Sequence, residues 1–183
     1  ESESDARVLL QQIFLTNRIE NGQCRVEIVA PSDAKNRVAI DYEIRIPQTL
    51  RLNMETTFGE IDAEAVSAIL TAETISGETI LRHLSSDQAG EAKLTSRSGE
   101  IRIDGWNAPE GNLTIDTLSG DIAAEGLSCR QAAVSSRSGE VKVVKVQTVA
   151  DTSFESISCD VTVEGGSVGT RATAKTQGGD VVI

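Results

Sequence analysis

From residue 52 to the C-terminus, apolar and polar positions recur with a period of about twenty residues. The phrase TSRSGEIRI, at residues 95–103, shows the repeated unit most clearly, and the residue before its acidic position serves here as the corner position. Seven residues occupy it along the chain, namely Gly59, Gly77, Gly99, Gly120, Gly139, Cys159 and Gly179. A self-similar period of this length is typical of solenoid proteins.

Around each corner, inward-facing positions lie two residues apart, as in a β-strand. Five and three residues before the corner the copies carry an apolar residue and then Thr or Ser, and two and four residues after it they carry mostly aliphatic residues. In the copy at Gly99 these residues are Leu94, Ser96, Ile101 and Ile103, which we expect to face inward, with Glu100 facing solvent. The five-residue step from Ser96 to Ile101 changes the parity of the alternation, so the chain must turn there. Glycine supplies backbone freedom for such a turn, and the hydroxyls can bond to nearby backbone or to the hydroxyl one rung away.

The alternation by two excludes a helical repeat, whose apolar positions would recur every three to four residues. A single twenty-residue unit cannot bury its apolar side chains alone, so stability requires neighbouring units to stack. The sequence therefore predicts an all-β fold: a parallel β-solenoid, or β-helix-like coil, of about seven rungs over residues 51–183, as one continuous domain.

The N-terminal region carries a different pattern. Alternating residues from position 7 lead to Asn21-Gly22, the strongest short hairpin signal, and alternation resumes after it. Apolar residues at every second position predict a third strand over Val38–Ile46, which ends there because Pro47 cannot donate to a strand ladder. Residues 7–50 are thus predicted to form an antiparallel β-meander that caps one end of the solenoid, preceded by a disordered or linker segment at 1–6.

Two spacings between corners are long, and we expect the extra residues to loop out from the scaffold. These segments are residues 81–92, which include His83, and residues 104–112, which include Trp106 and Pro109. Loops on a rigid scaffold are where specific sites commonly lie.

The three cysteines, Cys24, Cys129 and Cys159, are widely spaced and form no CxxC motif. This spacing indicates neither a zinc site nor a dense disulfide framework. Three buried thiols are favoured over one bridge with a free thiol, although both readings remain open.

The approach EIRIP at residues 43–47 and the corners TLSGDI, SRSGEI, SRSGEV and QGGDVVI resemble a bacterial family of adhesin-like domains of unknown function with repeated SGDI and SGEI corners. The resemblance covers Val38–Ile183 well and the first hairpin loosely. It implies a β-helical domain that is extracytoplasmic or membrane-tethered, with no catalytic motif to carry over. Thr79, in an otherwise aliphatic column, and Cys159, in the glycine column, depart from the pattern.

Composition narrows the range of partners. Seventeen basic residues against 28 acidic ones give a net charge of −11, and no run of Lys and Arg forms the basic stripe that nucleic acids require. An aromatic content of 3% argues against a large aromatic-lined sugar groove. We find no signal peptide or membrane span in the sequence, so any membrane tether is expected to lie outside this chain.

Every corner is followed by an acidic residue: Glu60, Glu78, Glu100, Asp121, Glu140, Asp160 and Asp180. This column is interpreted as a solvated edge whose carboxylates accept corner N–H groups, with weak cation binding as the alternative. His83, Ser85, Ser86 and Asp87 offer the residue types of a hydrolytic triad, but no nucleophile elbow surrounds either serine, so a polar loop is preferred.

No catalytic, cofactor-binding or metal-binding residue is predicted. The candidates for contact with a partner are Trp106, Arg97, Arg137 and His83. The expected function is a noncatalytic, extracytoplasmic, bacterial module, adhesin-like or scaffolding, that presents a flat face to an unknown surface ligand, protein or glycan.

Two alternatives remain. A small polysaccharide-active enzyme would need a groove that holds several carboxylates beside Arg97 or Arg137. An end-to-end assembling protein would use the solenoid ends, because the last rung, Gly179–Ile183, is expected to leave an open strand edge through which a homodimer would form.

Overall fold

The computed structural model describes residues 11, 14–20, 23–29, 52–65, 70–86 and 90–183, with backbone only for 14–20 and 23–29. The chain divides into two units, residues 1–45 and 46–183, and each is described by itself. The described residues contain strands and turns, and none of them belongs to a helix long and apolar enough to cross a membrane.

In the first unit, strands β1 (Phe14–Glu20) and β2 (Gln23–Val29) pair antiparallel. Glu20 faces Gln23 across the pair, so the two strands flank Asn21-Gly22 as predicted. The hairpin is confirmed. The third strand of the expected meander, Val38–Ile46, lies outside the described residues.

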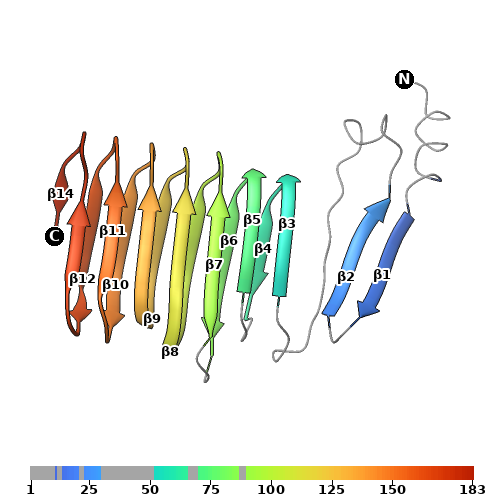
Figure 1. Cartoon of the computed structure of the whole chain (residues 1–183), viewed down its shortest axis with the longest axis horizontal. Coiled ribbons are helices and arrows are strands. Elements are labelled where there is room, and N and C mark those ends of the chain that lie inside the picture. The colour runs from blue at the N-terminus through green and yellow to red at the C-terminus, as the bar shows by residue number, and fades with distance from the viewer. Residues whose placement is uncertain (1–10, 12–13, 21–22, 30–51, 66–69, 87–89) are drawn as a thin grey trace. The chain divides into compact units, whose positions relative to one another are not determined.

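The second unit is a β-solenoid of about six turns, because seven corners delimit six complete turns. Figure 1 shows its strands standing side by side in two layers. All strand pairs in this unit are parallel, which confirms the predicted fold class. The strands are β3 (Leu52–Phe58), β4 (Ile61–Glu64), β5 (Leu70–Ser76), β6 (Thr79–Ser85), β7 (Glu91–Ser96), β8 (Ile101–Thr117), β9 (Ile122–Ser136), β10 (Val141–Thr148), β11 (Thr152–Ser156), β12 (Val161–Val168), β13 (Ala172–Lys175) and β14 (Val181–Val182).

Each turn contributes one strand before a corner and one after it. We call the two resulting layers the pre-corner layer and the post-corner layer. The pre-corner layer consists of β3, β5, β7, the second halves of β8 and β9, β11 and β13; the post-corner layer consists of β4, β6, the first halves of β8 and β9, β10, β12 and β14. β8 and β9 run through both layers, with a register shift in β8 between Ala108 and Asn112.

Strand register confirms the predicted columns. Two residues after the corner, Ile61, Thr79, Ile101, Ile122, Val141, Val161 and Val181 pair in unbroken succession. In the copy at Gly99, all four residues predicted to face inward are buried, namely Leu94, Ser96, Ile101 and Ile103. The inward residues of both layers meet in one apolar core, so the corner-based alignment of the sequence is the alignment of the rungs.

A second parity change, which the sequence analysis missed, occurs six residues after each corner. There the backbone is left-handed in every described rung, with positive φ at Ala65, His83, Gly105, Gly126, Lys145 and Gly165. After this bulge the inward positions shift by one residue, so Leu84, Trp106, Leu127 and Val146 point into the core. The expected loops at residues 81–92 and 104–112 were therefore largely wrong, because β6 continues to Ser85 and β8 continues through residues 104–112.

At the corners from Gly99 onward, the Ser or Thr hydroxyl three residues earlier bonds to backbone and not to the next hydroxyl. Ser136 Oγ accepts a hydrogen bond from Gly139 N–H at 2.8 Å and donates to the carbonyl oxygen of Gly120, one rung back, at 3.1 Å. Ser156 makes the same pair of bonds, to Cys159 N–H and to the Gly139 carbonyl. Thr176 repeats both bonds, whereas Ser96 and Thr117 accept from the glycine N–H of their own corner.

Close stacking explains the glycines. A Cβ on Gly99 would collide with the carbonyl oxygen of Gly77, and one on Gly120 would collide with that of Gly99. Glycine is therefore needed at these corners because of the neighbouring rung. Cys159 occupies the same column as these glycines, and its N–H still donates to the Ser156 hydroxyl. Thr79 is buried in the otherwise aliphatic column and does not interrupt the strand register.

The two kinds of glycine predict different responses to alanine. Gly99→Ala should lower the free energy of unfolding by about 3 kcal/mol, because its Cβ would overlap backbone atoms. Gly105→Ala should cost only about 1–2 kcal/mol, because a Cβ there meets nothing closer than His83 Cα at 3.7 Å and the penalty is the left-handed φ of 80°. Chemical denaturation of both variants measures the difference, and equal losses would contradict the stacking argument.

The corner hydroxyls allow a matched test with an isosteric substitution. Thr117 Oγ1 accepts from Gly120 N–H at 3.0 Å, whereas the buried Thr74 Oγ1 has no hydrogen-bond partner among the described residues. Thr117→Val should therefore destabilise the protein by about 1–3 kcal/mol by leaving a buried N–H unpaired, and Thr74→Val should be neutral or slightly stabilising. Thermal melts of the two variants measure their losses in stability. A loss for Thr74→Val as large as that for Thr117→Val would refute the assigned hydrogen bonding of the two hydroxyls.

Candidate functional site

The structure separates the four predicted contact residues. Trp106 is 1% exposed and lies in the core in register with Leu127, so its indole offers no surface to a partner. This corrects the expectation for Trp106, and the cause is the bulge at Gly105, which turns the next residue inward. The indole Nε1 has no hydrogen-bond partner in the described structure.

His83 is exposed in the post-corner layer, where it faces an acidic residue of the preceding rung. Its Nδ1 lies 3.7 Å from Glu64 Oε1, an ion pair only when the imidazole is protonated. Ser86 is buried, whereas His83 points to solvent from a left-handed backbone position, and Asp87 lies outside the described residues.

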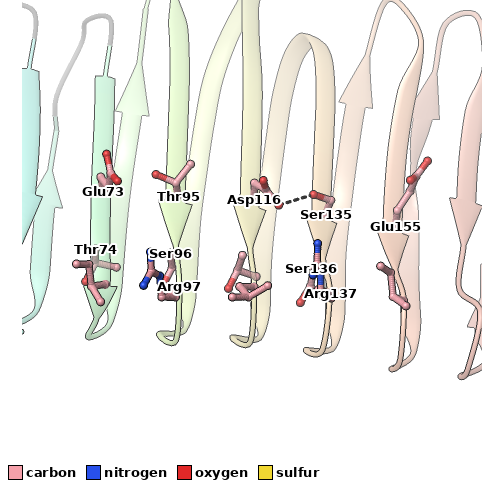
Figure 2. Close-up of a pocket in the computed structure, with 14 residues that line it drawn as sticks. Glu73, Thr74, Thr95, Ser96, Arg97, Asp116, Ser135, Ser136, Arg137 and Glu155 are labelled. Atoms are coloured by element: carbon pink, nitrogen blue, oxygen red, sulfur yellow. Dashed lines mark hydrogen bonds between the residues drawn. The ribbon is translucent and has the colours of Figure 1, made fainter. Parts of the chain in front are cut away.

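Arg97 and Arg137, in contrast, lie on the same surface. Each stands two residues before a corner, with one rung between them, and their backbone N–H groups bond to carbonyls of the rung before. Figure 2 shows both side chains near the corners of the pre-corner layer. They are accompanied by the residues two positions earlier and by those of the neighbouring rungs.

These outward residues alternate from rung to rung. In the two rungs with Arg two positions before the corner, the residue four positions before it is Thr or Ser. In the rung between these two and in the rung on either side of them, an aliphatic residue lies two positions before the corner and an acid four positions before it. We call this surface the alternating face; its five successive pairs are Glu73 and Ile75, Thr95 and Arg97, Asp116 and Leu118, Ser135 and Arg137, and Glu155 and Ile157. Strand register aligns the first members of the pairs.

The alternating face is hollowed into a shallow, open depression of about 510 Å³. Its aliphatic side chains remain unusually exposed for their type, at 39% for Ile75, 40% for Leu118 and 42% for Ile157. Ser135 Oγ donates to Asp116 Oδ1 at 2.8 Å, the bond drawn in Figure 2, and Glu155 lies 4.0 Å from Lys175 Nζ.

The guanidinium groups of Arg97 and Arg137 have no ion pair or side-chain hydrogen bond with any described residue. The face therefore presents two unpaired cations between exposed aliphatic side chains, on backbones that lie two strand spacings, about 9.6 Å, apart.

On the outer surface of the post-corner layer, several cations form ion pairs with acidic residues. Arg82 pairs with Asp62, and Arg102 Nε lies 2.7 Å from Glu100 and 3.4 Å from Glu78. Lys145 Nζ lies 2.6 Å from Glu125 Oε1; this contact lowers the pKa of Glu125 and raises the pKa of Lys145. Much of the charge on this surface is thus neutralised within the protein.

The acidic column after the corners follows the solvated-edge interpretation where the acid is Asp. Asp121 Oδ1 accepts from Glu140 N–H, and Asp160 Oδ1 accepts from Asp180 N–H, each at 2.8 Å. The short Asp side chain reaches the next rung. Among the described residues, no group of three or more acidic, His or Cys side chains gathers to hold a metal ion.

Two of the three thiols can be placed. Cys129 and Cys159 are both free; Cys129 is buried, and burial raises its pKa to about 12. Cys159 is partly exposed, which corrects the expectation that it is buried. Cys24 lies on β2, whose side chains are not described.

The last rung has neighbours on one side only within the described part of the chain, where β13 pairs β11 and β14 pairs β12. Val181, Val182 and Ile183 are exposed there. Association through this end stays a prediction.

The alternating face was not recognised from the sequence, although its residues are two and four positions before corners that the sequence identifies. The signal was the rung-to-rung alternation of Ile75, Arg97, Leu118, Arg137 and Ile157, which becomes visible when outward columns are read along the stack. Residues 13–183 match the family model described as Toastrack DUF4097. Neither the curated proteins nor the solved structures provide a match.

The thiols should differ in reactivity, because the thiolate is the reactive form and burial disfavours it at Cys129. In a Cys24→Ser variant under native conditions at pH 8, iodoacetamide should label Cys159 while Cys129 stays unmodified until the protein is unfolded. Intact-mass and peptide mass spectrometry measure the labelling, with the denatured variant as the control that accepts two labels. Native labelling of Cys129 at the rate of Cys159 would contradict the buried placement.

Proposed function

The chain belongs to the Toastrack DUF4097 family, and we propose that it is a noncatalytic binding module that acts outside the bacterial cytoplasm and binds its ligand on the alternating face. The observation that carries the proposal is the pair of uncommitted guanidinium groups, Arg97 and Arg137, set between exposed aliphatic side chains in one depression.

The chemistry of this face suits a binding surface. Arginine is enriched among the residues that dominate interface affinity, because its planar guanidinium offers five donors and stacks on flat groups. Ile75, Leu118 and Ile157 add apolar area that a ligand would remove from water. Small-molecule sites enclose most of their ligand, so a shallow, open depression fits an extended ligand better.

The scaffold supports the same conclusion. Each rung is tied to the next by strand pairing, and the corners of the alternating face are further fixed by hydroxyl bonds such as Ser136 Oγ to the Gly120 carbonyl. Side chains on such a stack keep a constant spacing, so an extended ligand can contact several rungs without reorganising the protein.

A small polysaccharide-active enzyme is the second candidate, because Glu73, Asp116 and Glu155 do stand beside the two arginines. Asp116 and Glu155 are two rungs apart, about 9.6 Å by strand spacing, against about 6.5–9.5 Å between the carboxyl groups of inverting glycosidases. Asp116 also accepts the Ser135 hydroxyl, and the open depression leaves these carboxylates in solvent. Release of new reducing ends from a bound glycan would favour the enzyme.

The location outside the cytoplasm rests on the resemblance of the SGEI and SGDI corners to adhesin-like domains. Fractionation of the native host with an antibody against the chain tests it, and recovery in the cytoplasmic fraction alone would refute it.

A combined glycan and protein array tests the binding role. Wild-type protein should bind a discrete set of ligands, and Leu118→Asp should abolish most of that signal, because it places a carboxylate in the centre of the depression. Val149→Asp is the matched control, since Val149 is an exposed aliphatic residue at the bend between β10 and β11 and does not line the depression. Ligands retained equally by both variants, or no ligand at all, would count against a binding role for this face.

A further inference from the structure

We infer that the ligand of the alternating face is an extended glycan that carries one anionic group on every second sugar. The inference rests on the proposed function, because it specifies what the same face binds. It follows from the order in which charged, polar and apolar groups succeed one another along the stack.

The two arginines set the spacing of the anionic groups. Arg97 and Arg137 are separated by one complete rung, so their backbones lie about 9.6 Å apart along the solenoid axis. Neither guanidinium is neutralised by a described side chain. A planar guanidinium binds a carboxylate or sulfate in a bidentate manner, so each arginine is suited to hold one anionic group.

That spacing favours a glycan over a peptide. In an extended peptide, side chains on one face recur about every 6.7 Å, so acidic residues placed on that face would fall out of step with the arginines. A pyranose ring in an extended glycan advances the chain by about one strand spacing. Alternate sugars would therefore coincide with alternate rungs, and a charge on every second sugar would meet an arginine each time.

The rungs between the arginines oppose a charge at the intermediate positions. Asp116 lies in the rung between those of Arg97 and Arg137, two positions before Leu118, and Glu73 and Glu155 occupy the equivalent position in the outer rungs. Ionised carboxylates only accept hydrogen bonds, so they suit the hydroxyls of a neutral sugar and repel a second anionic group. The net charge of −11 likewise disfavours a densely charged chain.

The remaining groups complete the match. Ser135 and Thr95, in the arginine rungs, offer hydroxyls that donate or accept. Leu118, at the centre of the face, provides an exposed aliphatic side chain for the C–H groups of a neutral sugar. A wholly neutral glycan would satisfy these contacts but leave both guanidinium groups without a partner.

Isothermal titration calorimetry with three octasaccharides tests the inference. The probes are a hyaluronan octasaccharide, which carries a carboxylate on alternate sugars, an octagalacturonate, which carries one on every sugar, and chito-octaose with all amines acetylated, which is neutral. Wild-type protein should bind the alternately charged probe about tenfold or more tightly than either of the others.

Variants then locate the contact. Arg97→Gln/Arg137→Gln should lose about tenfold or more in affinity for the alternately charged probe, and Arg97→Lys/Arg137→Lys should lose less, because it keeps the charge but not the bidentate geometry. Arg130→Gln/Lys142→Gln removes the same charge from exposed residues that do not line the face, and should change affinity by less than about twofold. Melting temperatures confirm that each variant is folded.

Equal binding of the fully charged or the neutral probe, or an equal loss in the Arg130→Gln/Lys142→Gln control, would overturn the inference. If the array ligands are proteins or neutral glycans that are lost in Leu118→Asp, the binding function stands and the glycan assignment falls. If neither the array nor the three probes give binding, both fall.

Discussion

The fold depends on how closely one corner can approach the next. At each stacked glycine corner, the corner backbone of one rung occupies the space in which a Cβ on the corner glycine of the next rung would lie. In the C-terminal rungs the corner carbonyl also accepts the Ser or Thr hydroxyl of the next rung, as Gly139 does from Ser156. The absence of a side chain and the presence of a hydroxyl three residues earlier are thus two parts of one contact. The close approach of backbone to glycine recurs at each stacked glycine corner, so it fixes the register of both layers, and every outward column follows from it.

The corner contact also explains how much of the fold could be predicted. Its residues are visible in the sequence, so the period, the parity change at the corner and the inward positions of Leu94 and Ile101 could be derived without coordinates. The second parity change could not be derived with the same ease, since Ala65, His83 and Lys145 occupy left-handed positions that glycine occupies in the other rungs. Gly105, Gly126 and Gly165 shared a spacing of six residues from their corners and were the available signal. Missing it placed Trp106 on the surface.

The candidate site was accessible to sequence reasoning in part. Arg97 and Arg137 were singled out as a pair, but the meaning of the pair depends on Leu118, the residue between them, and on the acids beside it. Only the three-dimensional register shows that these residues form one surface and that no described carboxylate neutralises the arginines. On the post-corner layer, Arg102 and Lys145 are held by acids. The two outer surfaces are built from the same kinds of residue, yet Arg97 and Arg137, unlike Arg82 and Arg102, leave their guanidinium groups available to another molecule.

The core and the alternating face have different translational periods. Corners, hydroxyls and inward apolar residues repeat in every rung, so the interior would accept the loss or duplication of a single unit of about twenty residues. The face repeats every second rung. Removal of the single rung that contains Leu118 would bring Arg97 and Arg137 one strand spacing apart, with two like charges side by side and no acid between them. The smallest unit by which such a protein could lengthen during evolution while keeping its surface chemistry is therefore a pair of rungs, roughly forty residues.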